Sequence, residues 1–169
     1  ARLFPGFYLN ELLMKLLARG DPHAALFDAY ADALQALAVA PDEAPLRAFE
    51  LQLLRETGVL PELSRITTTQ ARVRPAGSYL LQGEAGLAEA PAAEPAALPG
   101  STCLALQAAL DGGDAAALRR ACQGALPALR TQLRALLHYH LGTPALRTRQ
   151  LMLDVRRLLD AAPAATPSS

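Results

Sequence analysis

Residues 44–58 read APLRAFELQLLRETG, and their pattern sets the expectation for most of the chain. Pro45 suits the first turn of a helix, where its missing N–H costs little, and Gly58 suits the position just after a helix. The apolar residues between them recur at helical spacing: Leu46, Phe49, Leu53 and Leu54. We therefore expect an amphipathic helix from Pro45 to about Thr57.

Composition extends this expectation to the whole chain of 169 residues. Alanine occurs 36 times and leucine 34 times, whereas valine and isoleucine together occur only five times. Strands are enriched in β-branched residues and helices in alanine and leucine, so the imbalance argues against a large sheet. The predicted fold class is all-α, a bundle of five to seven helices in one domain of ordinary size.

Further helices are expected wherever the same periodicity returns. Asp114 is a good N-cap, and Pro127 should kink or divide the long helix that follows it. The other predicted helices lie between glycine and proline breaks, at about 5–18, 21–39, 101–110, 114–140 and 144–160. The last nine residues, 161–169, read AAPAATPSS and are predicted to be a disordered tail.

The segment 59–100 differs from the rest because it contains five prolines and lacks long helical periodicity. We predict an irregular lobe here, with room for one small hairpin and a short strand at Ser78–Gln82. Its end, the Ala/Pro/Glu-rich stretch 88–98, is predicted to be flexible.

The formal net charge is zero, but the charges are unevenly distributed along the chain. Residues 1–113 contain eight basic and 13 acidic residues, and residues 114–169 contain eight basic and three acidic ones. Arg130 and Arg134 fall on one helix face, and Arg147 and Arg149 fall in the first turn of the last helix. These four arginines are candidates for contacting nucleic-acid phosphates. The alternatives are a solvated helix face and, for Arg147 and Arg149, pairing with neighbouring carboxylates.

Several function classes lack their sequence signatures. Two cysteines, Cys103 and Cys122, cannot build a disulfide framework or a four-cysteine zinc site, and both are expected to be core thiols. No run of 18 apolar residues and no secretory signal pattern is present. Nucleotide-binding loops and the common catalytic motifs are also missing. We expect a non-enzymatic, cytoplasmic protein without a metal or cofactor.

Four strings in a fixed order carry a family resemblance, which covers about residues 4–160. They are GFYLNELLMKLL at 6–17, DPHAALFDAYADAL at 21–34, APLRAFELQLLRETGVLPELSR at 44–65 and HLGTPALRTRQLMLDVRRL at 140–158. Together they resemble the helical C-terminal portion of RecO, a bacterial recombination mediator and DNA-repair family. The resemblance implies that the N-terminal OB domain of that family is absent from this chain. Many family members have a four-cysteine zinc site in the lobe, but Ile66 and Thr69 stand where its first cysteine pair would fall, which indicates a zinc-free variant.

The resemblance also implies partners. RecO proteins anneal complementary DNA strands and, with RecR and in some pathways RecF, load RecA onto strands coated by single-stranded DNA-binding protein (SSB) at the bacterial nucleoid. The helical domain can bind the acidic, Phe-ending C-terminal tail of SSB.

Arg47 is the residue that we expect to bind the tail's carboxylate, with Leu51 and Leu54 contributing an apolar pocket for its Phe. The alternative for both leucines is the ordinary core. The alternative for the whole chain is a helical scaffold for oligomerisation or RecR docking, with no direct contact to DNA or to the tail.

Overall fold

The computed structural model describes residues 24–39 and 42–141, and these ranges contain five helices and three short strands. The helices predicted at 5–18 and 144–160 and the tail predicted at 161–169 lie outside the described residues. In chain order the elements are α2 Ala24–Val39, α3 Ala44–Glu56, β1 Ser78–Gln82, β2 Gly86–Glu89, β3 Leu98–Pro99, α4 Gly100–Gly112, α5 Ala115–Gln123 and α6 Leu126–Leu141.

The predicted all-α class is wrong in one respect, because the lobe contains a three-stranded antiparallel sheet of order β2-β1-β3. The short strand predicted at Ser78–Gln82 is confirmed as β1, the central strand. Tyr79 of β1 is paired with Glu89 of β2 and with Leu98 of β3. Tyr79 and Leu81 alternate with more exposed neighbours, so one face of β1 is buried against the helices.

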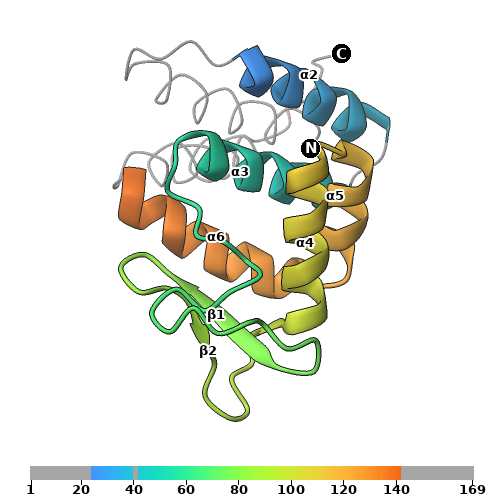
Figure 1. Ribbon diagram of the computed structural model, residues 1–169. Helices are drawn as coiled ribbons and strands as arrows, with labels where there is room; N and C mark the ends of the chain where they lie inside the picture. Colours follow the sequence, from blue (N-terminus) through green and yellow to red (C-terminus); the bar gives the residue numbers. More distant parts are fainter. Residues whose placement is uncertain (1–23, 40–41, 142–169) are drawn as a thin grey trace, which may run out of the picture.

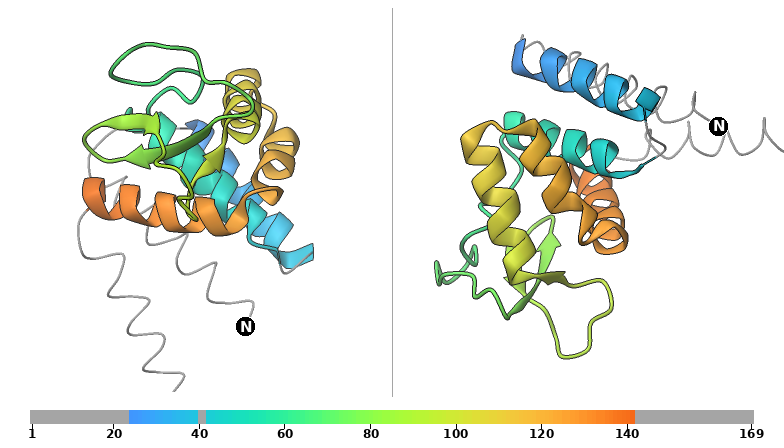
Figure 2. Two further views of the ribbon diagram at one scale, coloured as in Figure 1. Left: turned by 90° about the horizontal axis from the view of Figure 1, so that it is seen from below. Right: turned by 90° about the vertical axis from the view of Figure 1, so that its right-hand side faces the viewer.

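Helix α3 is central to the packing (Figure 1). Helix α2 lies along one side of α3, where Tyr30 and Phe49 meet edge to face with ring centroids 6.1 Å apart. Helices α5 and α6 pack against other sides of α3, and α6 also packs on β1. Figure 1 shows α6 lying between α3 and the sheet, and Figure 2 gives two further views of this arrangement. The sheet is therefore attached to the helical body mainly through α6.

Local signals explain where several helices begin and end. The Asp42 carboxylate accepts a hydrogen bond from the Ala44 amide at 3.0 Å, at the start of α3. The predicted cap at Asp114 is confirmed, since its carboxylate accepts from the Ala117 amide at 3.0 Å. The predicted long helix is divided into α5 and α6 at residues 124–125, so that Pro127 lies in the first turn of α6.

The lobe contains more regular secondary structure than predicted. Within the stretch predicted to be flexible, Glu89 is paired in the sheet, and a turn closes between the Glu94 amide and the Pro91 carbonyl. A buried glutamine of α6, Gln132, links this region to the helices. Its amide oxygen accepts from the Leu81 amide at 2.7 Å, and its amide nitrogen donates to the Ala96 carbonyl. One side chain therefore holds both the central strand and the loop that precedes β3.

Candidate functional site

The predicted tail-binding residue Arg47 is buried in the structure, with 6% of its surface exposed. Its guanidinium forms an ion pair with Glu50, one helical turn further along α3, at 3.0 Å. The Glu50 side chain is fully buried. Because desolvating two charges is costly, such a pair persists only where the attraction between them is strong. Arg47 therefore already has a carboxylate partner inside the domain.

The two leucines that were predicted to line a pocket for the tail's Phe are also core residues. Leu51 is 0% exposed and Leu54 is 1% exposed. They belong to the same apolar cluster as Phe49 of α3 and Leu133 of α6. The three predicted tail-binding residues thus lie on one helix, but all three are buried and cannot contact a partner in this structure.

The predicted phosphate-binding arginines of α6 are exposed and lie one helical turn apart. Arg130 is fully engaged, because its guanidinium donates two hydrogen bonds to the carboxylate of Glu43, one of them from Nε at 2.9 Å. Arg134 also has an interaction partner. Arg147 and Arg149 lie outside the described residues. Of these four candidates, the structure brings Arg130 and Arg134 to one helix face.

A groove of about 750 Å³ runs between α2, α5 and the start of α3, and we call it the α2–α5 groove. Its cationic residues are Arg119 and Arg120 of α5, and neither has a carboxylate partner among residues 24–39 and 42–141. Its apolar wall includes Ala36 and the highly exposed Val39, both from α2. These arginines were counted in the basic C-terminal part, but nothing in the sequence set them apart as a site.

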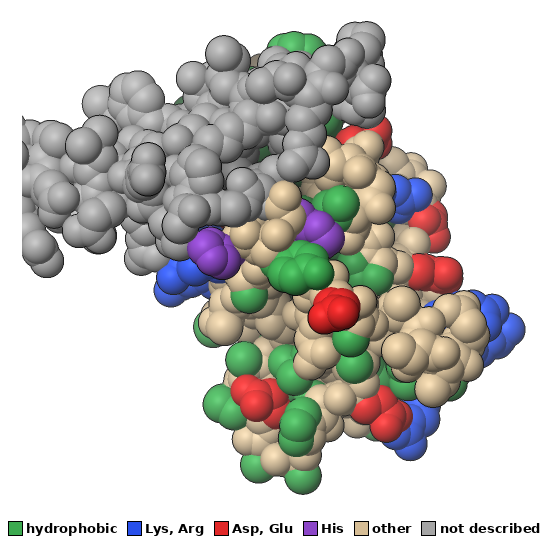
Figure 3. Space-filling model, turned by 90° about the vertical axis from the view of Figure 1, so that its left-hand side faces the viewer, with side chains coloured by type: hydrophobic (Ala, Val, Ile, Leu, Met, Phe, Trp, Pro, Cys, Tyr) green, Lys and Arg blue, Asp and Glu red, His purple; other side chains and the backbone are tan. Residues whose placement is uncertain are grey.

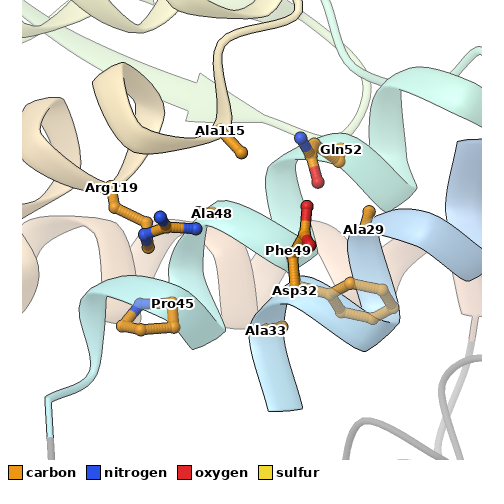
Figure 4. Close-up of a pocket in the computed structure, with 9 residues that line it drawn as sticks. All are labelled: Ala29, Asp32, Ala33, Pro45, Ala48, Phe49, Gln52, Ala115 and Arg119. Atoms are coloured by element: carbon orange, nitrogen blue, oxygen red, sulfur yellow. The ribbon is translucent and has the colours of Figure 1, made fainter. Parts of the chain in front are cut away.

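The groove also contains two carboxylates. Asp42 is engaged locally, since it accepts hydrogen bonds from the Ala44 amide and, at 2.6 Å, from the Gln123 side chain of α5. Asp32 of α2 lines both the groove and a narrower pocket next to it. Figure 4 shows this narrower pocket, with Arg119 extending from α5 towards the contact between α2 and α3. A ligand in the groove therefore meets two available cations, an apolar wall and one carboxylate that is not held by a neighbouring helix.

No group of three or more potential metal-binding side chains occurs in the described ranges. Burial raises the pKa of both Cys103 and Cys122 to about 12, so both thiols stay protonated and are poor nucleophiles at neutral pH. No described helix combines the length and the hydropathy needed to span a bilayer.

Comparison with known proteins agrees with the resemblance noted from the four strings. Residues 1–150 match the family model described as "Recombination protein O C terminal". The chain belongs to this family. Relatives named "DNA repair protein RecO" include those of Polaromonas sp. strain JS666, 51% identical, Verminephrobacter eiseniae, 52%, and Acidovorax ebreus, 50%. Each alignment covers 92% of this chain and 63–64% of the relative, so the chain spans somewhat less than two thirds of their length.

Proposed function

We propose that this chain is a non-enzymatic mediator domain in bacterial DNA repair and recombination. It binds the acidic, Phe-ending tail of SSB and supports strand annealing and RecA loading together with RecR, in the cytoplasm at the nucleoid. The observation that carries the proposal is the identity of about 50% to proteins named "DNA repair protein RecO", over 92% of the chain.

The α2–α5 groove suits the first contact with such a tail. An acidic peptide needs unpaired cations, and a terminal Phe needs apolar surface; Arg119 and Arg120 offer the cations and Val39 lies beside them. Arg47, Leu51 and Leu54 remain proposed contacts, but they require a different state of the domain. Because they are buried, a tail can reach them only if the packing around α3 opens.

Titration of a fluorescent acidic peptide ending in Phe tests this function and separates the two contact sets. We expect Arg119→Gln/Arg120→Gln to weaken binding about tenfold, because charge-assisted hydrogen bonds are lost from an exposed site. Arg47→Lys keeps the buried charge, and it weakens binding only if the tail reaches Arg47. Arg65→Gln/Arg72→Gln, in the lobe, removes the same charge elsewhere and serves as the control.

Two results would contradict the proposal. If the wild-type chain does not bind the peptide, tail recognition is excluded as its function. If the peptide without its terminal Phe binds equally well, the apolar part of the site is wrong.

DNA contact by the helical face stays a proposal for Arg130, Arg134, Arg147 and Arg149. Arg130 is the weakest of these candidates, because a phosphate would have to displace Glu43 from its two hydrogen bonds. The alternative is a scaffold for oligomerisation or RecR docking. Light scattering and a RecR pull-down test it, and it is favoured if RecR binds while neither the peptide nor DNA does.

A further inference from the structure

The segment 64–74, which we call the arginine loop, has the highest local positive charge in residues 1–113, where acidic residues outnumber basic ones. It contains Arg65, Arg72 and Arg74 and no acidic residue. The remainder of residues 1–113 contains five basic and 13 acidic residues. Figure 2 shows this loop projecting from the helices. Such a cationic element is suited to an anionic ligand.

The loop holds two of its arginines directly opposite each other. Arg65 and Arg72 form an isolated antiparallel bridge. The hydrogen bonds around them run from the Val73 amide to the Ser64 carbonyl and from the Ile66 amide to the Ala71 carbonyl, both at 2.9 Å. Arg65 and Arg72 are therefore a non-hydrogen-bonded pair, in which the Cα atoms are only about 4.5 Å apart and the side chains share one face. Like charges in this position are unfavourable.

Within the part of the chain that the structure describes, no carboxylate compensates for this repulsion. Arg65 donates a hydrogen bond to the Gln70 carbonyl at 3.1 Å, which is a neutral acceptor. Arg72 is exposed and has no hydrogen-bond or ion-pair partner within the described ranges. The third arginine is different, since Arg74 is paired with Glu89 of β2 at 3.0 Å. The loop thus places two arginine side chains on one face, and neither guanidinium has a carboxylate partner among the described residues.

The backbone of the loop is held in place, so little order has to be gained on binding. Gln70 has a φ of +60°, a strained value for a residue with a side chain. Two hydrogen bonds of 2.9 Å hold it, from its amide to the Ile66 carbonyl and from its side chain to the Thr67 carbonyl. The Thr67 hydroxyl in turn accepts from the Leu87 amide at 2.8 Å, which fastens the loop to β2. A pre-organised site of this kind binds with a smaller entropic cost.

We propose that Arg65 and Arg72 form a phosphate-binding pair that contacts the backbone of a nucleic acid. Adjacent guanidinium groups match the spaced, delocalised charge of phosphodiesters, and they need no base contact. The inference rests on the proposed function in DNA repair and gives that function a second surface, separate from the α2–α5 groove. On the part of the surface that is visible in Figure 3, acidic side chains lie between cationic side chains at the margins.

Fluorescence anisotropy with the 169-residue chain and a labelled oligothymidine strand tests the proposal. We expect Arg65→Gln/Arg72→Gln to raise the Kd about tenfold at low salt. The dependence of the binding constant on salt should become weaker. The negative slope of log K against log salt should decrease in magnitude by about 1.4, since two phosphate contacts to a single strand are lost. The matched control is Arg119→Gln/Arg120→Gln, which removes two unpaired arginines from the α2–α5 groove and should leave the Kd within about twofold.

A charge reversal separates binding from folding. Arg72→Glu places a carboxylate opposite Arg65, so a cross-strand ion pair replaces the repulsion. We expect its melting temperature to be equal to or above that of the wild type, while oligothymidine affinity falls at least as far as in the double variant. Unchanged affinity in this folded variant would overturn the proposal.

Other outcomes are equally decisive. The proposal fails if the wild-type chain does not bind the strand at low salt, or if both double variants lose affinity equally, since net charge alone then explains binding. It also fails if Arg65→Gln/Arg72→Gln lowers the affinity for the acidic peptide and leaves the affinity for the oligothymidine strand unchanged. Failure of the proposed tail binding is seen separately, as lack of peptide binding by the wild type.

Discussion

On the helical body, Arg130 of α6 binds Glu43 through two hydrogen bonds and Arg47 of α3 is buried against Glu50, whereas in the lobe Arg65 lies opposite Arg72. From the sequence alone, cations without a carboxylate partner would be expected in residues 114–169, where basic residues outnumber acidic ones. Folding brings Glu43, from residues 1–113, onto Arg130, whereas Arg119 and Arg120 have no carboxylate partner among the described residues. The lesson is that the number of carboxylates within reach, and not the net charge of a segment, decides which arginines are available for a ligand.

The largest expected effect concerns the buried pair on the helical body. Arg47→Ala should lower the free energy of unfolding by about 3–5 kcal/mol, because it removes an ion-pair partner from a carboxylate that is fully buried. Urea unfolding measures this loss. The control is Arg47→Met/Glu50→Leu, which removes both charges and should recover most of the stability. A loss below about 1 kcal/mol for Arg47→Ala would mean that its charge is not needed for folding, and would weaken the contrast with the lobe.

The next prediction tests how far the lobe depends on the helical body. Gln132→Leu should cost about 1–3 kcal/mol, because the buried Leu81 amide loses its acceptor on α6. Hydrogen exchange at Leu81 should accelerate more than exchange in α3. Gln35→Leu, on the exposed side of α2, is the control and should change stability by no more than about 0.5 kcal/mol. Equal protection of Leu81 in variant and wild type would show that the sheet holds β1 without this link.

Local patterns predicted much of the secondary structure. The 44–58 periodicity gave α3 to within one residue at each end, Asp114 was identified as a cap, and Ser78–Gln82 was identified as a strand. These features depend on neighbours in the sequence, so the sequence is sufficient to find them. The partner strand Gly86–Glu89 was missed because GLAE, beside an Ala/Pro-rich run, has no β-branched residue to signal a strand.

The candidate sites depended on long-range contacts and were predicted less well. Nothing near Arg130 in the sequence shows that Glu43, 87 residues away, lies against it. Arg47 has Glu50 three residues later, and an i,i+3 pair could have been considered, but its burial depends on how α3 packs against other helices. The pairing of Arg65 with Arg72 requires the turn between them, whose strained residue, Gln70, is not a typical choice for a positive φ.

A double-mutant cycle on Arg130 and Glu43 tests the exposed pair on the helical body. We expect a coupling energy of about 1 kcal/mol, at the upper end for exposed pairs because the contact has two hydrogen bonds. The cycle compares Arg130→Gln, Glu43→Gln and the double variant by urea unfolding, at low and at high salt. Salt should reduce the coupling, because both side chains are about half exposed. A coupling near zero would make Arg130 as available to phosphates as Arg72.

The smallest effect is expected in the lobe, and its sign matters more than its size. Arg72→Thr should raise the free energy of unfolding by about 0.3 kcal/mol, because it removes a like charge directly opposite Arg65 and introduces a residue that favours strands. Arg74→Thr, two residues along, should lower stability instead, because Arg74 is paired with Glu89. High salt should shrink both changes, since screening weakens repulsion and attraction alike. If both variants lower stability, Arg72 contributes to the fold as Arg47 and Arg130 of the helical body do, and it is not a cation left available for a ligand.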